Sequence, residues 1–376
     1  MASTSDSAPA ATAALAWATS HATRYEKRLA ALVGIDSGVD DAAGREQVAT
    51  LLAGWAREAG CEADLVPTPQ GSHLVARLEG DGDARIILLG HHDTVFPRGV
   101  AAERPFRVRR GRAYGPGVAD MKGGLLVGLA AIESLAHGAR PFASVELHSV
   151  PDEEVRTGAF AEFERLRGAT AVLVFECGRE NGDVVVGRKT AAWVRMGVAG
   201  RAAHAGANPE DGRNAVVGLC SQILRCDGLN GAREGLTVVA GTVSGGTSPT
   251  MVPDAAEATI DVRAVSSEDL HWAVEQIAAF DLARGLAGAV EFHPGWPGIE
   301  PNRGTETIFT EALRLAAVLG MPLGGQTSGG VSDGCWTSQD GIPTIDGLGP
   351  VGGRDHSPRE YILLNSVPGR CALWHH

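Results

Sequence analysis

The segment IILLGHHDTV, residues 86–95, decides the fold class of this chain. Its apolar half has the pattern of a buried strand, and this strand ends abruptly in His91, His92 and Asp93. Polar side chains at the carboxyl end of a parallel strand lie where α/β sheets bind ligands. His91 and Asp93 are two residues apart, so the carboxylate can orient the imidazole for metal binding. Taken alone, however, the segment is explained more simply by a structural histidine at a strand end.

The sequence on both sides of this segment alternates between strand and helix patterns. Apolar runs at 74–78, 144–150 and 171–177 are separated by helical patterns such as 123–137. A small, polar tip of about twelve residues, expected to be disordered, precedes a helical pattern over 13–33. This alternation predicts an α/β fold with a mixed central sheet flanked by helices.

A second pattern begins at about residue 191. The pattern predicts the order βαββαβ. The first strand ends at residue 200, and the other three span 236–243, 256–263 and 289–293. The two helices span 214–229 and 267–282. After Pro301 the first pattern resumes, with a helix over 305–319, a strand near 343–346 and a final helix after Pro358. We therefore expect a catalytic domain made of residues 1–189 and 300–376, with a ferredoxin-like domain, residues 190–299, inserted into it.

Composition excludes several classes of protein. Hydrophobic residues at 44% and charged residues at 21% allow a sizeable core in 376 residues, which excludes disorder of the whole chain. The net charge of −12 argues against nucleic acid or an anionic membrane as the main partner. Six cysteines without a CxxC pattern predict reduced thiols. Since there is neither a charged leader nor a long apolar run, we expect a cytoplasmic protein without a membrane span.

Two further segments carry carboxylates at the ends of predicted elements. The glycine-rich GPGVADMKGG, residues 115–124, presents Asp120 just ahead of a helix. One carboxylate can bridge two divalent cations, although an aspartate that caps the helix is an equal alternative. Residues 152–154 place Asp152, Glu153 and Glu154 directly after a strand. Such a triplet is costly unless cations or solvent neutralise it, and a solvated helix start is the alternative.

Glu176 at the end of another strand and His356 in the glycine-rich segment 349–358 complete a set of strand-end and loop positions. Imidazole and carboxylate ligands without thiolates suit Zn²⁺, Mn²⁺ or Co²⁺ in a hydrolytic site rather than a structural zinc. The set therefore indicates a catalytic metal centre.

The motifs GHHDTV, GPGVADMKGG, PDEE, FEC and DGLGPVGGRDHSP resemble, in order and spacing, those of the co-catalytic zinc peptidases. That family includes glutamate carboxypeptidase, succinyl-diaminopimelate desuccinylase, acetylornithine deacetylase and aminoacylase. GRKT at 187–190, GLGPVGG and GGVSDG look most like glutamate carboxypeptidase. The resemblance implies two divalent ions per chain, most simply zinc, with Mn²⁺ or Co²⁺ as alternatives. One ion would be bound by His91, Asp120 and Glu176, and the other by Asp120, Glu154 and His356.

The same resemblance assigns roles to other residues. Glu153 matches the general base, and Asp93 matches the acid that holds His91. The inserted domain matches a lid that usually also forms a homodimer, and His204 matches a histidine that stabilises the oxyanion, often in the partner's active site. Arg263 matches a residue that binds the substrate carboxylate, and Gly330, in GGVSDG, belongs to the expected substrate site.

Two positions depart from the family pattern and bear on the substrate. Thr250 stands where many relatives carry Asn, and Trp296 where glutamate carboxypeptidases tend to carry Arg. An indole could favour an apolar or aromatic group. Lys189 and Arg188 remain possible partners of a substrate carboxylate, although a solvated strand end explains them about equally well.

We therefore expect a dinuclear metal-dependent hydrolase that cleaves the amide of a small N-acyl amino acid or dipeptide-like substrate, of carboxypeptidase or aminoacylase type. One alternative is hydrolytic deamination or deacylation of a non-peptide acid, including an aromatic one. An alternative of another class is an inactive relative that only binds metal or ligand. Retention of Glu153 and of all five ligand positions argues against the latter.

Overall fold

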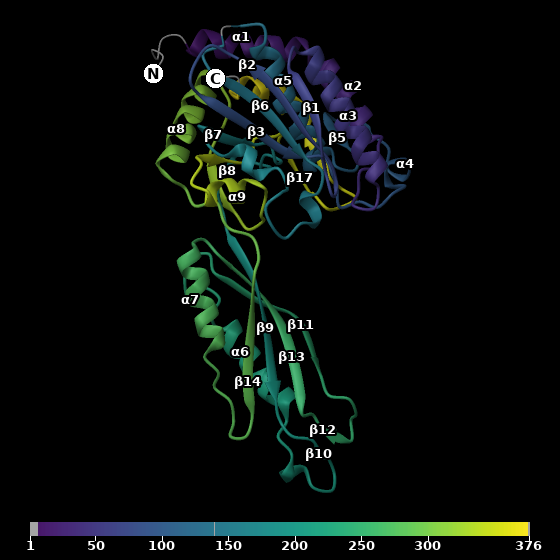
Figure 1. Cartoon of the computed structure of the whole chain (residues 1–376), viewed down its shortest axis with the longest axis vertical. Coiled ribbons are helices and arrows are strands. Elements are labelled where there is room, and N and C mark those ends of the chain that lie inside the picture. Colours follow the sequence, from purple (N-terminus) through teal and green to yellow (C-terminus); the bar gives the residue numbers. More distant parts are fainter. Residues whose placement is uncertain (1–6, 139, 375–376) are drawn as a thin grey trace. The chain divides into compact units, whose positions relative to one another are not determined.

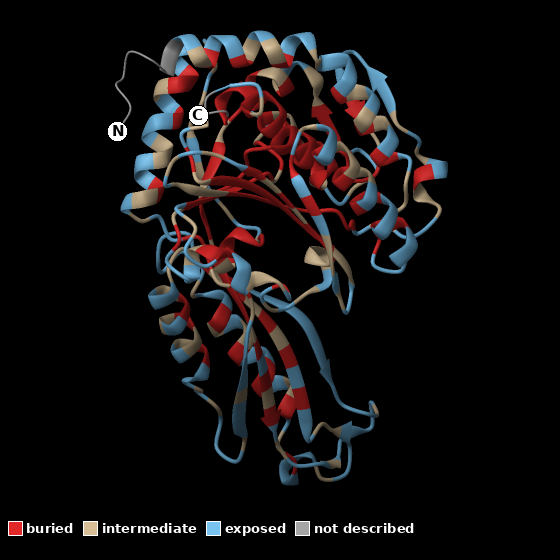
Figure 2. Ribbon diagram, turned by 45° about the horizontal axis from the view of Figure 1, so that its top comes forward, coloured by how far each residue is buried: buried red, intermediate tan, exposed pale blue. Residues whose placement is uncertain are grey.

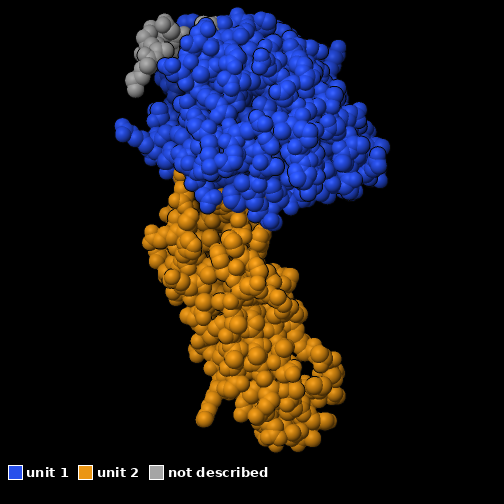
Figure 3. Space-filling model, in the orientation of Figure 1, with its two compact units in different colours: residues 1–187, 301–327, 332–376 blue, residues 188–300, 328–331 orange. Residues whose placement is uncertain are grey.

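The computed structural model describes residues 7–138 and 140–374. The chain divides into two compact units, shown in Figure 3. Unit 1 comprises residues 1–187, 301–327 and 332–376, and unit 2 comprises residues 188–300 and 328–331. The boundaries expected from the sequence, at 189/190 and 299/300, lie close to these. The short segment 328–331, which clusters with unit 2, was not anticipated.

Unit 1 is built on a mixed six-stranded sheet (Figure 1). Four strands are parallel and two, at one edge, are antiparallel to their neighbours. This arrangement agrees with the mixed central sheet predicted from the sequence. In spatial order the strands are β1 (Glu62–Thr68), β2 (Gly71–Glu79), β6 (Ser144–Val150), β3 (Arg85–His91), β7 (Ala171–Val174) and β16 (Thr344–Ile345).

Helices flank this sheet, and their inward sides form the buried core of unit 1 (Figure 2). The most apolar of them, α5 (Gly123–Leu135), is buried almost all round, as expected for a helix without a polar stripe. The others are α1 (Ser7–Ser20), α2 (Ala22–Val33), α3 (Ala42–Glu58), α4 (Val100–Glu103), α8 (Arg303–Val318), α9 (Gly334–Gln339) and α10 (Val367–Leu373).

The amino-terminal region differs from the sequence prediction. The single helix expected over 13–33 is two helices, α1 and α2, which break at His21, whose ring nitrogen bonds to the carbonyl of Trp17 at 2.8 Å. Residues 7–12 belong to α1 rather than to a disordered tip. Because these residues are small and rich in alanine, the sequence did not indicate that they belong to α1, which packs on α10 and α8. The rest of the predicted tip, residues 1–6, lies outside the described residues.

A small four-stranded sheet lies beside this core, and the sequence did not reveal it. Its order is β17 (Gly352–Gly353), β18 (Tyr361–Leu363), β5 (Arg112–Tyr114) and β4 (Arg107–Arg109), all antiparallel. Strands of two or three residues are too short to show a period. The final helix expected after Pro358 is α10, which begins only at Val367. Strand β18 lies between Pro358 and this helix.

Unit 2 has its own sheet and its own core. The antiparallel strands run in the order β11 (Thr237–Gly245), β13 (Ala255–Ala264), β9 (Thr190–Ala199) and β14 (Ala287–Pro294). Helices α6 (Ala215–Asp227) and α7 (Ser267–Ala278) cover one face, and the inward residues of β9 and β13 alternate with more exposed ones. This is the βαββαβ order expected from the sequence.

Short elements complete the two units. Arg188 and Ile299, near the two ends of the insertion, exchange backbone hydrogen bonds of 3.1 and 3.0 Å. Strand β8 (Val184–Arg188) pairs with β15 (Gly325–Ser328), and β10 (Ala203–His204) pairs with β12 (Met251–Val252). The single-turn helices are η1 (Val118–Lys122), η2 (Glu153–Val155), η3 (Phe163–Leu166), η4 (Pro209–Asp211) and η5 (Leu364–Ser366).

All six cysteines are free thiols, and only Cys220 is exposed. Within residues 7–138 and 140–374, helices of the length and apolar character needed to span a membrane are lacking.

Candidate metal centre

The five predicted metal ligands all belong to unit 1 and lie at the carboxyl ends of its parallel strands or in the loops beside them. His91 ends β3, Glu154 lies in η2 after β6, and Glu176 follows β7. Asp120 lies in the turn η1 before α5, and His356 lies in the loop between β17 and β18. The chain thus brings together side chains that are up to 265 residues apart in sequence, from His91 to His356 (356 − 91 = 265).

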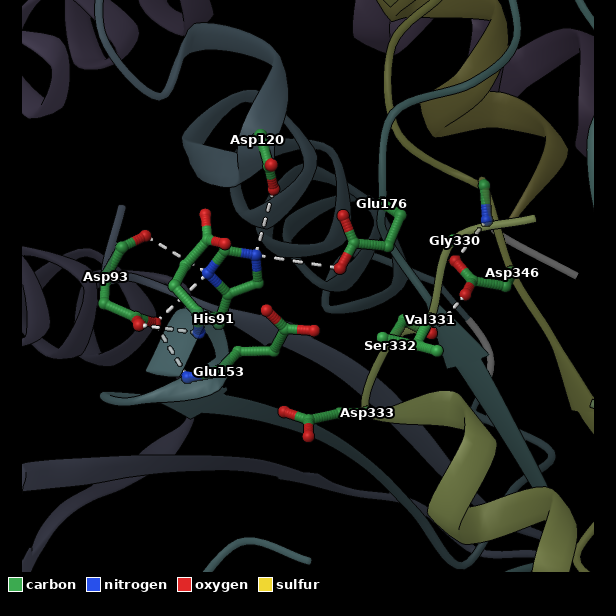
Figure 4. Close-up of polar contacts among 12 residues, drawn as sticks. His91, Asp93, Asp120, Glu153, Glu176, Gly330, Val331, Ser332, Asp333 and Asp346 are labelled. Carbon is green, nitrogen blue, oxygen red and sulfur yellow. Dashed lines mark hydrogen bonds and ion pairs between the residues drawn. The ribbon is translucent and has the colours of Figure 1, made fainter. Parts of the chain in front are cut away.

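Asp120 is the centre of this arrangement, because its two carboxylate oxygens contact different imidazoles. Oδ1 lies 3.1 Å from Nε2 of His91, and Oδ2 lies 2.9 Å from Nε2 of His356. Nε2 of His91 is also 3.7 Å from Oε1 of Glu176, as Figure 4 shows. Nε2 of His356 is 3.3 Å from Oε2 of Glu154. The result is two groups of three side chains that share Asp120.

Asp93 orients both His91 and the acidic turn that follows β6. Its Oδ1 is 3.2 Å from Nδ1 of His91, while its two oxygens accept hydrogen bonds from the backbone N–H groups of Glu153 and Glu154, at 3.1 and 3.0 Å. With Nδ1 directed at Asp93, Nε2 of His91 is the nitrogen that faces Asp120 (Figure 4). One buried carboxylate therefore positions an imidazole and the two glutamates of η2.

The buried charges of this cluster shift the pKa values of its members in opposite directions. Burial opposes ionisation of Asp120, but hydrogen bonds from His356 and His91 keep its pKa below the ordinary value. Hydrogen bonds to Asp120 and Glu154 raise the pKa of His356 to about 11. Burial raises the pKa of Glu153, and the negative charges of Asp333 and Glu176 add to this effect although His91 opposes it. The cluster thus has an excess of negative charge that favours cations.

The donor set suits divalent metal ions. Single ligand atoms of His91, Asp120 and Glu154 all lie within 4.8 Å of one another. Oε1 of Glu154 is buried and has no hydrogen-bond partner among the described residues, which is costly for a carboxylate oxygen unless a cation binds it. Imidazole and carboxylate donors without a thiolate match zinc in a hydrolytic site and also accept Mn²⁺ or Co²⁺.

Glu360 supports the centre, and sequence reasoning missed it. Its buried carboxylate accepts hydrogen bonds from the backbone N–H groups of Gly117, Ala119 and Asp120, at 3.0, 2.7 and 3.0 Å. Glu360 lies four residues after His356. A single carboxylate therefore connects the two loops that carry Asp120 and His356. A glutamate at that spacing beyond a ligand histidine was the only signal in the sequence.

A second set of buried charges lies below Glu153. Arg156 bonds to Asp152 at 2.5 Å and to Asp333, which lies beneath Glu153 in Figure 4. Burial raises the pKa of Asp333 to about 6, although Arg156 opposes this. Oδ2 of Asp333 has no hydrogen-bond partner among the described residues. Sequence reasoning noted GGVSDG only as a family pattern and assigned this aspartate no role.

His204 and Thr250 lie together in unit 2, on the ribbon β10–β12. The carbonyl of Thr250 accepts a hydrogen bond of 2.9 Å from the N–H of Ala205, next to the exposed His204. Nδ1 of His204 accepts bonds of 3.1 and 3.0 Å from the N–H groups of Gly206 and Ala207. A neutral imidazole that accepts at Nδ1 carries its proton on Nε2, so His204 presents a hydrogen-bond donor to its surroundings.

Three predicted substrate-binding residues lie around the segment 328–331 of unit 2. Arg263 bonds to the carboxylate of Asp261 at 3.0 Å and to the carbonyl of Gly329 at 2.7 Å. Arg188 is buried and donates to the carbonyl of Gly330 at 3.0 Å. The backbone N–H of Lys189 bonds to the carbonyl of Ser328 at 3.0 Å. The two guanidinium groups therefore hold a glycine-rich segment.

Trp296 is largely buried. The residue is only 7% exposed, and its backbone carbonyl accepts hydrogen bonds from Ala191 and Thr190. Side chains that line a substrate pocket are commonly buried in this way, so the substrate contact expected of its indole stays a prediction.

Comparison with known proteins identifies the class of protein. The sequence profile of the family described as "Peptidase family M20/M25/M40" matches residues 87–376. Carboxypeptidase G2 from Pseudomonas sp. is 30% identical over 364 residues, covering 92% of this chain and 86% of that protein. Succinyl-diaminopimelate desuccinylase from Alkalilimnicola ehrlichii is 30% identical over 335 residues, covering 83% of this chain and 88% of that protein.

Solved structures show the same fold. The aminopeptidase PepT from Bacillus cereus has a TM-score of 0.80 and 25% identity, covering 93% of this chain and 96% of that chain. A tripeptidase from Staphylococcus aureus has a TM-score of 0.78 and 22% identity, covering 94% of this chain and 96% of that chain. The chain therefore belongs to peptidase family M20/M25/M40, and it is a hydrolytic enzyme of the peptidase and amidohydrolase type.

Proposed function

We propose that this enzyme is a dinuclear metal-dependent amidohydrolase, which cleaves the amide bond of a small N-acyl amino acid or dipeptide-like substrate. The observation that carries the proposal is the shared Asp120, whose two oxygens contact the imidazoles of His91 and His356. The likeness to a carboxypeptidase and to a desuccinylase supports amide cleavage, since both names describe cleavage next to a carboxylate-bearing group.

The residues divide into two ligand groups around Asp120. His91 and Glu176 would hold one divalent ion with Asp120, and Glu154 and His356 would hold the other. Two bound divalent ions supply acidification of a water molecule and polarisation of the scissile carbonyl. Zinc suits the mixed imidazole and carboxylate donors best.

Glu153 would act as the general base. It lies in η2, held by the bond from its backbone N–H to Asp93, and its side chain belongs to neither ligand group. Its carboxylate would take a proton from the attacking water and transfer it to the nitrogen of the leaving amine. Asp93 keeps His91 oriented meanwhile, and Asp333 adds negative charge beside Glu153.

Unit 2 would supply substrate recognition. The donor Nε2–H of His204 suits the oxyanion of a tetrahedral intermediate, and we propose that it serves the active site of the partner in a homodimer. Arg263 would bind the substrate carboxylate, with Gly330, Thr250 and Lys189 beside it. Because the guanidinium of Arg263 already pairs with Asp261, the substrate carboxylate would share it with that aspartate.

The alternatives have less support. The aromatic or non-peptide acid rests on Trp296 and on the missing arginine alone, and neither the carboxypeptidase nor the desuccinylase to which the chain is similar has a name that points to such a substrate. An inactive relative would not need Glu153 held beside an intact ligand set, and loss of that base is the simplest route to inactivity.

A panel of N-acyl amino acids and dipeptides, assayed with and without a chelator, tests the proposal. We expect hydrolysis of at least one amide, its loss on chelation, and its return with Zn²⁺, Mn²⁺ or Co²⁺. Hydrolysis that persists in the metal-free protein would contradict the proposal. A panel in which only amidines or other non-amide C–N bonds are cleaved would favour the alternative chemistry.

A further inference from the structure

One face of the small sheet of unit 1 carries exposed arginines, with a partly exposed and a buried tyrosine among them. In the β4–β5 register Arg107 lies directly opposite Tyr114, and Arg109 lies opposite Arg112. Tyr361 on β18 lies opposite Tyr114, and the two rings are 6.2 Å apart. Residues directly opposite one another on antiparallel strands share a face. These five side chains therefore form one surface, which we call the arginine face.

The other side of β5 and β18 faces the protein interior. Ala113 and Ile362, which alternate with the residues of the arginine face, are 0% exposed. Glu360, adjacent to Tyr361, is also buried and bonds to the backbone of Asp120. The metal-binding loop and the arginine face thus lie on opposite sides of β18.

The arginine face is strongly basic in an acidic protein. Its three arginines are exposed, and none of them forms an ion pair with a carboxylate within residues 7–138 and 140–374. Four more arginines also lack such a pair there: Arg104 and Arg110 lie close to these three in sequence, and Arg354 and Arg359 lie in the loop between β17 and β18. The whole chain nevertheless carries a net charge of −12. Neighbouring like charges are destabilising, so fold stability does not explain the cluster.

The guanidinium groups are held in place by the tyrosines. Arg107 lies over the ring of Tyr114 at 5.4 Å, and Arg112 lies over the ring of Tyr361 at 4.3 Å. Stacking leaves the N–H groups at the edge of each guanidinium free to bind carboxylates in pairs. It also covers the rings, which are the platforms that bases of single-stranded nucleic acid would need.

The edge of this sheet offers backbone hydrogen bonds as well. Strand β4 is the last in the order, and a two-residue turn, Arg110 and Gly111 with φ of 52° and 75°, joins it to β5. In such a hairpin the residues that flank the turn, Arg109 and Arg112, form a hydrogen-bonded pair. The alternate residue, Val108, then directs its N–H and C=O to the free edge, and its side chain is 43% exposed.

We propose that the arginine face, together with the free edge of β4, binds an extended, carboxylate-rich segment of a partner protein. A strand added to this edge would pair with Val108 and place every second side chain, about 6.8 Å apart, on the side of Arg107 and Arg109. Glutamate or aspartate at those positions would receive paired hydrogen bonds from the guanidinium groups. A long nucleic acid would instead extend past the face over the acidic remainder of the protein, where like charges repel it.

A short fluorescein-labelled peptide of alternating glutamate and threonine tests the proposal by fluorescence anisotropy. We expect binding that weakens with added salt and that falls about tenfold or more in Arg107→Glu/Arg109→Glu. The matched control is Lys27→Glu/Arg303→Glu, which makes the same change in net charge at two exposed positions elsewhere in unit 1. An equal loss in the control, or undiminished binding in the first variant, would overturn the proposal.

Val108→Pro tests the contribution of the edge. Proline is tolerated where a backbone N–H points away from the sheet, so the variant should unfold at the wild-type temperature yet bind the peptide several-fold more weakly. Unchanged affinity in a folded variant would overturn the edge pairing. Chelation of metals should leave peptide affinity unchanged, and its loss on chelation would place the peptide at the metal centre. Tighter binding of an oligothymidylate through the same arginines would reassign the face to nucleic acid.

Discussion

The carboxylate of Glu360 accepts a hydrogen bond of 3.0 Å from the backbone N–H of Asp120 and also binds the N–H groups of Gly117 and Ala119. The proposed bridging ligand of the metal centre is thus held in place by a residue that belongs to neither proposed ligand group. Such supporting contacts commonly change metal affinity by about 10–100-fold when they are removed.

We therefore predict that Glu360→Gln weakens binding of both metal ions by about 10–100-fold, because an amide has one acceptor oxygen and would turn its NH₂ group toward an N–H donor. Competition with a chromogenic chelator measures the affinity. Glu180→Gln is the control, since Glu180 bonds to the hydroxyl of Tyr361 and not to the loop of Asp120. Equal affinities for Glu360→Gln and the wild type would show that the loop holds its position unaided.

Metal stoichiometry should respond differently to the shared ligand and to an unshared one. Elemental analysis of the wild type is expected to give two ions per chain. Asp120→Asn should weaken both ions, since each oxygen of Asp120 faces one ligand group, whereas Glu176→Gln should weaken one. A fully active wild type with a single tightly bound ion would exclude the dinuclear assignment.

Substitutions of the two adjacent glutamates of η2 should distinguish a loss of catalysis from a loss of metal binding. Glu153→Gln is expected to retain both ions and to lower kcat by about 10²–10⁴-fold, because a general base is lost. Glu154→Gln should lose metal instead, since Oε2 of Glu154 lies beside His356. A Glu153→Gln enzyme that keeps most of its kcat would remove Glu153 from the mechanism.

The cross-subunit role of His204 predicts complementation. His204→Ala should cost about 10²–10³ in kcat while the metals stay bound. Mixing it with inactive Glu153→Gln should restore part of the activity, because one site of the mixed dimer receives an intact Glu153 and an intact His204. Sedimentation as a monomer, or no recovery after verified subunit exchange, would leave His204 acting within its own chain or not at all.

Two buried histidines predict a loss of stability in mild acid. His73 and His148 bond to each other at 3.0 Å, and both are 0% exposed. Burial, followed by the neighbouring His148, holds the pKa of His73 well below its ordinary value. Burial also lowers the pKa of His148, although Glu146 opposes this. Both histidines are therefore neutral in the folded state at pH values where the unfolded chain already takes up protons.

This difference in protonation between the folded and unfolded states determines how stability depends on pH. The stabilising contribution is complete above the unfolded pKa, about 6.5, and it falls by up to about 1.4 kcal/mol per pH unit for each histidine below that value. Urea unfolding of the metal-free protein between pH 7.5 and pH 5 measures it. His73→Gln should flatten the dependence, whereas His137→Gln, at an exposed position, should leave it as in the wild type. Parallel curves for the wild type and His73→Gln would contradict the assignment.

The sequence predicted long elements and the polar residues that end them. The strands containing His91 and Glu146 and the helix α5 have enough apolar residues for their periods to be recognised, so the central sheet and the strand-end cluster could be anticipated. Spacing alone left Asp120 open between a helix cap and a bridging ligand. The family resemblance, not the residue pattern, divided the ligands into two groups.

What the sequence could not predict depends on contacts between distant segments. Strands β4, β5, β17 and β18 have two or three residues each, and only their pairing with one another reveals them. Glu360 gains its role from the N–H groups of a loop more than 200 residues away in sequence. The substrate-site role of Trp296 came from the family pattern, and a local pattern does not report the burial that packing gives this residue.

The reciprocal hydrogen bonds between Arg188 and Ile299 mean that the insertion leaves and re-enters unit 1 at nearly one point. A gene in which a short turn replaces residues 190–297 would therefore join β8 to the segment before α8 without stretching the chain. Such a replacement would leave the strands of the unit 1 sheet intact. The peptide 328–331, encoded separately, would lose Arg263, which binds the carbonyl of Gly329, and would keep Arg188, which binds the carbonyl of Gly330.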